Sequence, residues 1–92
     1  MIEALTATVR VPNRLGLHAR AAAKLVNVAN GFESRIEISK GEQVADAKSI
    51  MGVLLLCGGQ GQELTFRVLG PDAEPALASL CALVADGFGE LP

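Results

Sequence analysis

Apolar and polar residues alternate along four short stretches of the chain, which is the period-two pattern of a strand with one buried face. Pro12 ends the first stretch, and the turn residues 40–42 (Lys-Gly-Glu) predict a tight turn between the second and the third. The four expected strands lie at 5–11, around Ile36 and Ile38, around Val44, and at 64–68.

Between these strands, apolar residues three and four positions apart predict helices. The first begins at Ala19, and Gly31 should end it as a C′ residue. The second is short, with Ser49 as N-cap before the apolar run 50–55 and glycines at 58, 59 and 61 after it. The expected buried residues of the first helix are Ala22, Leu25, Ala29 and Phe32.

The last helix should begin at Asp72 as its N-cap, with Pro75 in the first turn and Gly87 at the end. Its expected buried stripe is Leu77, Leu80, Cys81 and Val84. The order is then β, α, β, β, α, β, α, in the α/β (α+β) class. Strands in one layer and helices in the other bury both sets of apolar faces, which predicts an open-faced sandwich.

Length, composition and charge limit the number of domains and the kinds of partner. Ninety-two residues, half of them apolar, suffice for one core, so we expect a single domain over 1–92. The net charge of −2 and scattered basic residues argue against nucleic acid as a partner. The apolar run from Ile50 to Cys57 is too short to span a membrane, and the first ten residues do not resemble a signal peptide. We therefore expect a cytoplasmic protein.

The two cysteines, Cys57 and Cys81, are far apart and each has apolar neighbours. In a reducing cytoplasm this favours two small buried thiols over a disulfide. With no CxxC pair and a single histidine, we expect neither a structural metal site nor a bound cofactor.

The one histidine, His18, stands where the Ala-rich helix begins, in the segment GLHARAAAK. Backbone N–H groups of a first helical turn lack partners within the helix, and the macrodipole adds positive charge there, so this end suits a phosphate. The same field disfavours a protonated ring, which leaves a ring nitrogen able to attack phosphorus. Arg20 can clamp phosphate oxygens and offset their charge. The segment therefore predicts a phosphoryl-accepting site.

Other uses of these residues are poorer fits. No Cys, Asp or Glu accompanies His18 at ligand spacing, and no nucleophile elbow is present for a hydrolase triad. The glycine cluster CGGQGQE lacks the Lys-Ser/Thr of a P-loop and is expected to be a connector.

Ser49 has two interpretations, since a helix N-cap explains a serine there but also exposes its hydroxyl to phosphorylation. The four apolar residues Ile50, Met51, Leu54 and Leu55 cannot all face inward on a short helix. Some of them should form an exposed patch, either as surplus core or as a docking surface.

The motifs GLHARAAAKLV and AKSIMGVLLL, followed by a strand and a last helix, resemble HPr, the histidine-containing phosphocarrier of the phosphoenolpyruvate-dependent sugar phosphotransferase system. The resemblance covers essentially the whole chain. It implies a four-stranded antiparallel sheet with three helices on one side, and a stoichiometric carrier in place of an enzyme.

The resemblance also implies roles for individual residues. His18 would take a phosphoryl group on Nδ1 from enzyme I and pass it to an EIIA domain, and Arg20 would contact that group. Ser49 would be phosphorylated by an HPr kinase/phosphorylase in organisms that have one. Docking of partners would use Leu17, Ile50, Met51 and Leu54.

One residue departs from the family pattern: Ala21 stands where proline usually follows the arginine. Alanine keeps an N–H and some backbone freedom that proline would remove. Transfer rate and pathway branch, sugar or nitrogen, stay open at this point.

We expect a monomeric phosphocarrier. Two other classes stay open: a regulatory binding module of the same fold acting through Ser49 and its apolar patch, and a small metal-binding or ligand-binding α/β domain, against which the lack of a ligand cluster argues.

Overall fold

The computed structural model describes residues 3–90, so four terminal residues of the predicted domain lie outside it. The strands are β1 (Leu5–Arg10), β2 (Arg35–Lys40), β3 (Gln43–Asp46) and β4 (Glu63–Leu69). The helices are α1 (Ala19–Asn30), α2 (Ile50–Leu55), α3 (Ala73–Ala85) and a 3₁₀ turn, η1 (Gly87–Gly89). The predicted element order is confirmed, with η1 as an addition.

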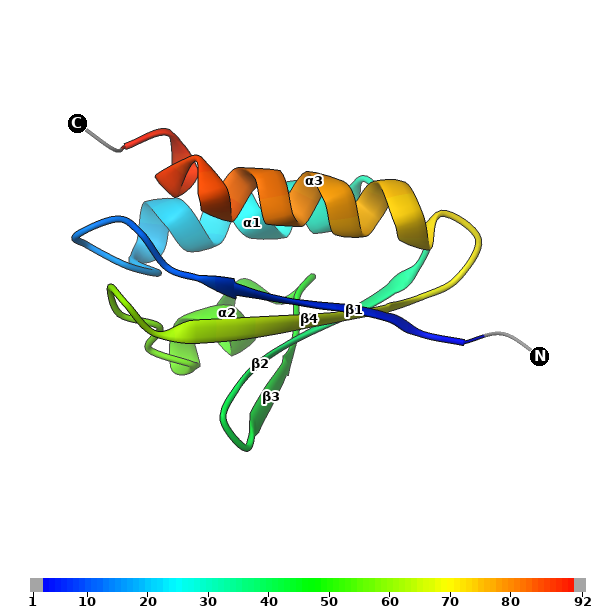
Figure 1. Ribbon diagram of the computed structural model, residues 1–92, viewed down its shortest axis with the longest axis horizontal. Helices are drawn as coiled ribbons and strands as arrows, with labels where there is room; N and C mark the ends of the chain where they lie inside the picture. The colour runs from blue at the N-terminus through cyan, green and yellow to red at the C-terminus, as the bar shows by residue number, and fades with distance from the viewer. Residues whose placement is uncertain (1–2, 91–92) are drawn as a thin grey trace.

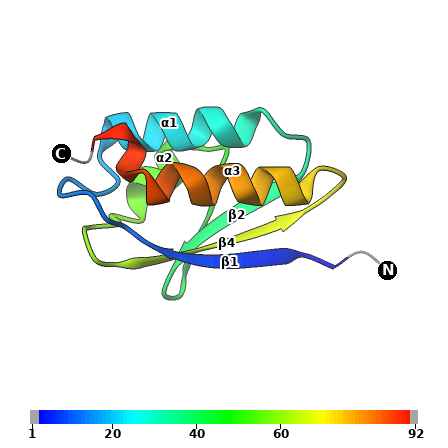
Figure 2. The ribbon, with the colours of Figure 1, turned by 45° about the horizontal axis from the view of Figure 1, so that its top comes forward.

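The four strands form one antiparallel sheet in the order β1-β4-β2-β3. The last strand in the chain, β4, lies between the first two, with Val9 opposite Leu64 and Ile38 opposite Phe66. The helices lie on one side of the sheet, with α1 and α3 side by side (Figures 1 and 2). The predicted open-faced sandwich is confirmed, and the other face of the sheet is uncovered.

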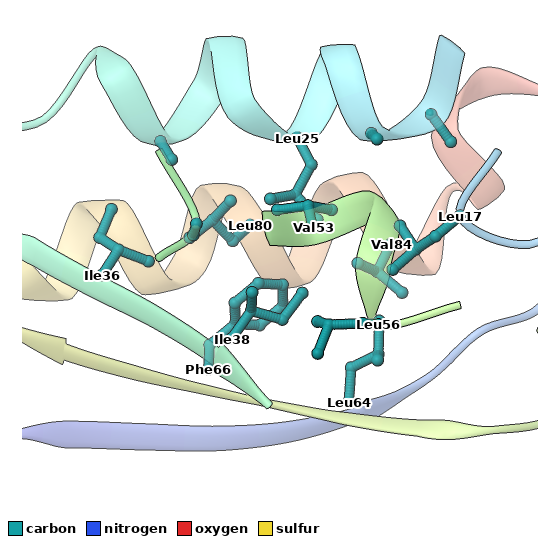
Figure 3. Close-up of a cluster of buried hydrophobic side chains, with 14 of the residues drawn as sticks. Leu17, Leu25, Ile36, Ile38, Val53, Leu56, Leu64, Phe66, Leu80 and Val84 are labelled. Atoms are coloured by element: carbon teal, nitrogen blue, oxygen red, sulfur yellow. The ribbon is translucent and has the colours of Figure 1, made fainter. Parts of the chain in front are cut away.

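The core lies between the helices and the sheet, where apolar side chains from every layer meet (Figure 3). The inward positions of β4 are fully buried, as the alternation predicted, and so are Leu25 of α1 and Val53 of α2. Large side chains with almost no exposure include Leu25, Ile36, Ile38, Val53, Leu64, Phe66, Leu80, Val84 and Phe88. At roughly 1.5–3 kcal/mol per buried side chain, this cluster is the main source of stability.

Two helix ends agree with the prediction only in part. Gly31 ends α1, as predicted, but as its C-cap with φ −76°, a right-handed conformation in which the Gly31 N–H donates to Val28 O. Asp72 occupies the N-cap position of α3, but its side chain does not cap that helix. It accepts hydrogen bonds from the amides of Glu33 and Ser34 and from the Ser34 hydroxyl, which ties the α1–β2 loop to the start of α3.

The expectation of two buried thiols is wrong for Cys57, which is exposed, and Cys81 is half-buried. Cys57 follows the end of α2 with φ 53°, a left-handed conformation that turns its side chain outward while Leu56 takes the buried position. Neither cysteine is in a disulfide.

No helix within residues 3–90 is long and apolar enough to cross a bilayer.

Candidate functional site

His18 is the N-cap residue of α1, with extended backbone (φ −71°, ψ 176°). The loop before it is fixed against the connector after α2: the Leu17 N–H donates to the Gly58 carbonyl oxygen at 2.7 Å. Gly16 has φ +62°, and a Cβ there would lie 2.4 Å from that same oxygen. The glycine cluster is thus a connector, as predicted, and it also supports the loop that carries His18.

The two ring nitrogens of His18 have different partners. Nδ1 lies 3.2 Å from the backbone N–H of Arg20, and Nε2 lies 2.7 Å from Oε2 of Glu90. The Arg20 amide can only donate a hydrogen bond, so Nδ1 has the lone pair, and an ionised carboxylate can only accept, so Nε2 has the proton. The lone pair of Nδ1 therefore lies at the N-terminal turn of α1, where it accepts a hydrogen bond from the Arg20 amide.

Glu90 is held by a second residue far from it in the chain. Its Oε1 accepts from Nδ2 of Asn13 at 2.7 Å, and the same Nδ2 donates to Gly16 O at 3.0 Å. Asn13 is only 2% exposed, so the carboxylate is anchored to a buried group. These hydrogen bonds from His18 and Asn13 lower the pKa of Glu90, which favours its ionised form.

Glu90 is a residue of the site that was not predicted from the sequence. It lies 72 positions after His18, and nothing in the local pattern GFGE marks a carboxylate that returns to the start of α1. The three successive positive φ values of Gly87, Phe88 and Gly89 are the feature that turns the chain there, and two glycines were the available signal.

Arg20 is exposed, and within residues 3–90 its side chain takes part in no ion pair or hydrogen bond. It lies in the first turn, two residues after the nucleophilic ring. Ala21 follows at 0% exposure, in the third helical position. Pro75 occupies the matching position of α3, so the fold accepts proline at such a place.

Ser49 caps α2, as predicted, and its Oγ accepts from the Gly52 N–H at 3.2 Å. Ile50, Met51 and Leu55 are exposed and Leu54 is half-buried, so the expected apolar patch is present.

Leu17 does not belong to that patch, which corrects the sequence prediction. It is 5% exposed and points into the core beside Val84 and Leu56 (Figure 3), because the bond from its N–H to Gly58 turns the side chain inward. Leu15, which the sequence analysis passed over, is 71% exposed. An apolar residue inside a polar turn was the signal for it.

The site thus joins a ring nitrogen that holds a lone pair, a helix N-terminus and an exposed guanidinium, which together suit transfer of a phosphoryl group. The described residues hold no cluster of three or more His, Cys, Asp or Glu side chains able to bind a metal ion.

Comparison with known proteins agrees with this geometry. The family model described as "PTS HPr component phosphorylation site" matches residues 5–86. The chain is 49% identical over 78 residues to the phosphocarrier protein HPr of Cupriavidus necator, covering 85% of this chain and 88% of that protein. It is 46% identical over 82 residues to the phosphocarrier protein NPr of Shewanella violacea, covering 89% and 90%.

The crystal structure of HPr-C-His from Thermoanaerobacter tengcongensis is similar, with a TM-score of 0.92 and 38% identity over 96% of this chain and 99% of that one. Sequence and structure agree on the family, whose members act as carriers in the phosphotransferase system and not as enzymes. The chain therefore belongs to the HPr family of phosphocarriers.

Proposed function

We propose that His18 accepts a phosphoryl group on Nδ1 from enzyme I charged by phosphoenolpyruvate, and passes it to a histidine of an EIIA domain. The observation that carries this proposal is the pair of hydrogen bonds at the ring, which leaves the lone pair on Nδ1 at the N-terminus of α1. The amides of that turn and the helix dipole favour the incoming negative charge.

Arg20 supplies the counter-charge in this proposal. A phosphoryl group adds about two negative charges, and a guanidinium can hold two of its oxygens at once. The exposed side chain can swing to the group when it arrives, with no ion pair among the described residues to break. The protein itself is a reactant consumed and regenerated, so most of the catalytic assistance comes from the partner that positions it.

Partners dock on the apolar patch of Ile50, Met51 and Leu54, and we add Leu55 to it because it is exposed on the same helix. A partner that covers this patch buries apolar surface beside the phosphoryl group, which is how a carrier can be recognised by several proteins in turn. The carrier acts as a cytoplasmic monomer.

Ser49 is the proposed regulatory site, phosphorylated by an HPr kinase/phosphorylase. Its hydroxyl lies at the N-terminus of α2, where a phosphate is favoured and would place charge next to Ile50 and Met51. Ser49→Asp should therefore keep the cap and slow phosphoryl transfer from enzyme I by about tenfold or more through repulsion at the docking patch. The measurement is the transfer rate; equal rates in Ser49→Asp and the wild type would contradict a regulatory role.

The decisive experiment incubates the wild type and His18→Ala with phosphoenolpyruvate and enzyme I. One acid-labile, alkali-stable phosphoryl group on the wild type alone is the expected result. If enzyme I from the same genome labels neither protein, the carrier role of His18 is wrong. The regulatory binding module acting through Ser49 and its patch then takes its place, and label confined to Ser49 after incubation with ATP and the kinase would favour it.

The nitrogen branch is a second candidate pathway, because the chain is similar to an NPr as well as to an HPr. The two branches differ in the acceptor. Phosphorylated protein offered to a sugar-specific EIIA and to a nitrogen-branch EIIA should transfer faster to the one it serves.

A further inference from the structure

We propose that Glu90 is a positioning residue for His18: with Asn13 behind it, its carboxylate holds the proton on Nε2 and so makes Nδ1 the atom that accepts phosphorus. This inference rests on the proposed function and adds to it a residue from the far end of the chain. The contact is direct, 2.7 Å from Nε2 to Oε2, between side chains that are 28% and 23% exposed.

The carboxylate can hold the proton on Nε2 because each of its two oxygens accepts one hydrogen bond. Oε2 accepts from His18 Nε2–H, and Oε1 accepts from Asn13 Nδ2. Asn13 is buried and is itself fixed by its bond to Gly16 O, so it cannot follow a moving carboxylate. If the proton were on Nδ1, the ring would lose its hydrogen bond to Glu90. The Nδ1–H would also point at the backbone N–H of Arg20, so two donors would face each other.

The main chain delivers Glu90 to this place through the segment 87–90, called here the C-terminal hook. Phe88 is fully buried with φ 57°, and its carbonyl oxygen accepts from Lys24 Nζ at 2.6 Å. The hook is therefore anchored through Phe88 alone, to the core by its ring and to α1 by the bond from Lys24 to its carbonyl oxygen. Glu90 follows two positions later and reaches the start of the same helix.

During transfer, the Nδ1 lone pair forms the nitrogen–phosphorus bond while the bond from phosphorus to the phosphorylated group of enzyme I breaks, and that group keeps the electron pair. Nε2 keeps its proton, and the ring becomes more positive. Glu90 faces this charge from the side away from the phosphoryl group, so it stabilises the phosphorylated ring without repelling the phosphate at close range.

Glu90→Gln tests the proposal because it leaves one acceptor oxygen where there were two. The amide must then turn its NH₂ toward Asn13 Nδ2 or toward His18 Nε2, so one hydrogen bond is lost. Even where the amide oxygen faces His18, it is an uncharged and weaker acceptor for Nε2–H, so either arrangement weakens the hold on the ring. Asp86→Asn is the matched control: it removes the same charge from an exposed residue four positions earlier in the chain.

The first measurement is ¹⁵N NMR of the histidine ring in the unphosphorylated proteins, above neutral pH. The wild type and Asp86→Asn should show one neutral form with a protected, downfield Nε2–H proton, and Glu90→Gln should lose that proton signal and shift toward a mixture of ring forms. Backbone spectra report that each variant is folded. An unchanged ring spectrum in folded Glu90→Gln would overturn the proposal.

The second measurement is the rate of phosphorylation by enzyme I. We expect Glu90→Gln to be slower by about three- to tenfold, the effect of one partly solvated charged hydrogen bond, and Asp86→Asn to match the wild type. Equal rates in the two variants would overturn the positioning role. Failure of the wild type to be phosphorylated would instead count against the proposed function, while the ring spectrum would still report on Glu90.

Discussion

Gly16 is the residue whose replacement should disturb the His18 loop most directly. It combines φ +62° with a site where a Cβ would lie 2.4 Å from Gly58 O. Gly41 has nearly the same φ, +60°, but no atom within 4 Å of the position of a Cβ. Replacing each glycine by alanine therefore distinguishes the cost of backbone strain, present at both positions, from the cost of steric overlap, present at Gly16 only.

Gly41→Ala should cost about 1 kcal/mol of unfolding free energy, from the left-handed conformation alone. Gly16→Ala should cost about 3 kcal/mol or more, because the loop or the Gly58 connector must also move. Urea denaturation of both variants measures the difference. Equal losses of unfolding free energy in the two variants would mean that the overlap between a Cβ at position 16 and Gly58 O is relieved at no cost.

His18, Arg20 and Ser49 could be placed at helix starts from the sequence alone, because a helix start leaves signals within a few positions of itself. Their roles in phosphoryl transfer and regulation stay predictions. Glu90 and the inward turn of Leu17 could not be predicted, since each depends on a contact across the fold: Glu90 with Asn13 and His18, Leu17 with Gly58.

At the scale of elements, Asp72 joins the α1–β2 loop to α3. Hydrogen bonds from the Ser34 hydroxyl and the Glu33 amide lower its pKa, so in the folded protein the carboxylate stays ionised to a lower pH than in the unfolded chain. The stabilisation is therefore complete above the unfolded pKa, near 4, and is lost as pH falls through the folded value.

Asp72→Asn should lower the unfolding free energy near neutral pH, because an amide places donors against the donors of Ser34. The gap between variant and wild type should shrink below about pH 4, where the wild-type carboxyl also becomes protonated. Thermal unfolding across pH measures it. Glu74→Gln, an exposed carboxyl in the same helical turn, should show no such loss; a gap that stays constant to low pH would contradict the role given to the Asp72 charge.

The strands and helices themselves were predictable because the buried positions of β4 and of α3 repeat with the period of their element. The predicted stripe of α3 was right for Leu80 and Val84, but Leu77 and Cys81 are only half-buried, and Ala73 and Ala76 are buried instead.

The ends of the helices were less predictable. Cys57, Gly31 and Asp72 lie where a helix stops or starts, and there the conformation depends on neighbours in space. Asp72 stands at the N-cap position, but its carboxylate accepts from the amides of the loop before β2 and not from those of α3.

At the scale of the molecule, Phe88 couples the core to the site. Its ring is fully buried while the residue two positions later contacts His18. Phe88→Ala should lower the unfolding free energy by about 3–5 kcal/mol, as expected for removing a buried aromatic ring, and should also release Glu90.

The expected signature is a joint loss of stability and of the Nε2–H signal of His18. Phe32→Ala supplies the comparison, since Phe32 is half-buried beyond the far end of α1. It should lose less stability and keep the signal. A Phe88→Ala protein that is destabilised but retains the signal would show that Glu90 does not depend on the hook.

Strand order is the part of the architecture that the pattern did not determine. Alternation predicts which face of β4 is buried, but it cannot tell that β4 lies between β1 and β2, because many pairings bury the same faces. The family resemblance implied an antiparallel sheet but no strand order, so the order comes from the structure.

The hook has a practical consequence for anyone preparing this protein. The start of β1 and the segment after α3 lie at opposite ends of the molecule, and the segment after α3 is the one beside the loop before α1 (Figures 1 and 2). An affinity tag or fluorescent fusion added downstream of Glu90 would leave the fold next to the ring of His18 and compete with incoming proteins. The same tag placed ahead of Glu3 would extend from the remote end, so the amino-terminal fusion is the one to build for transfer assays.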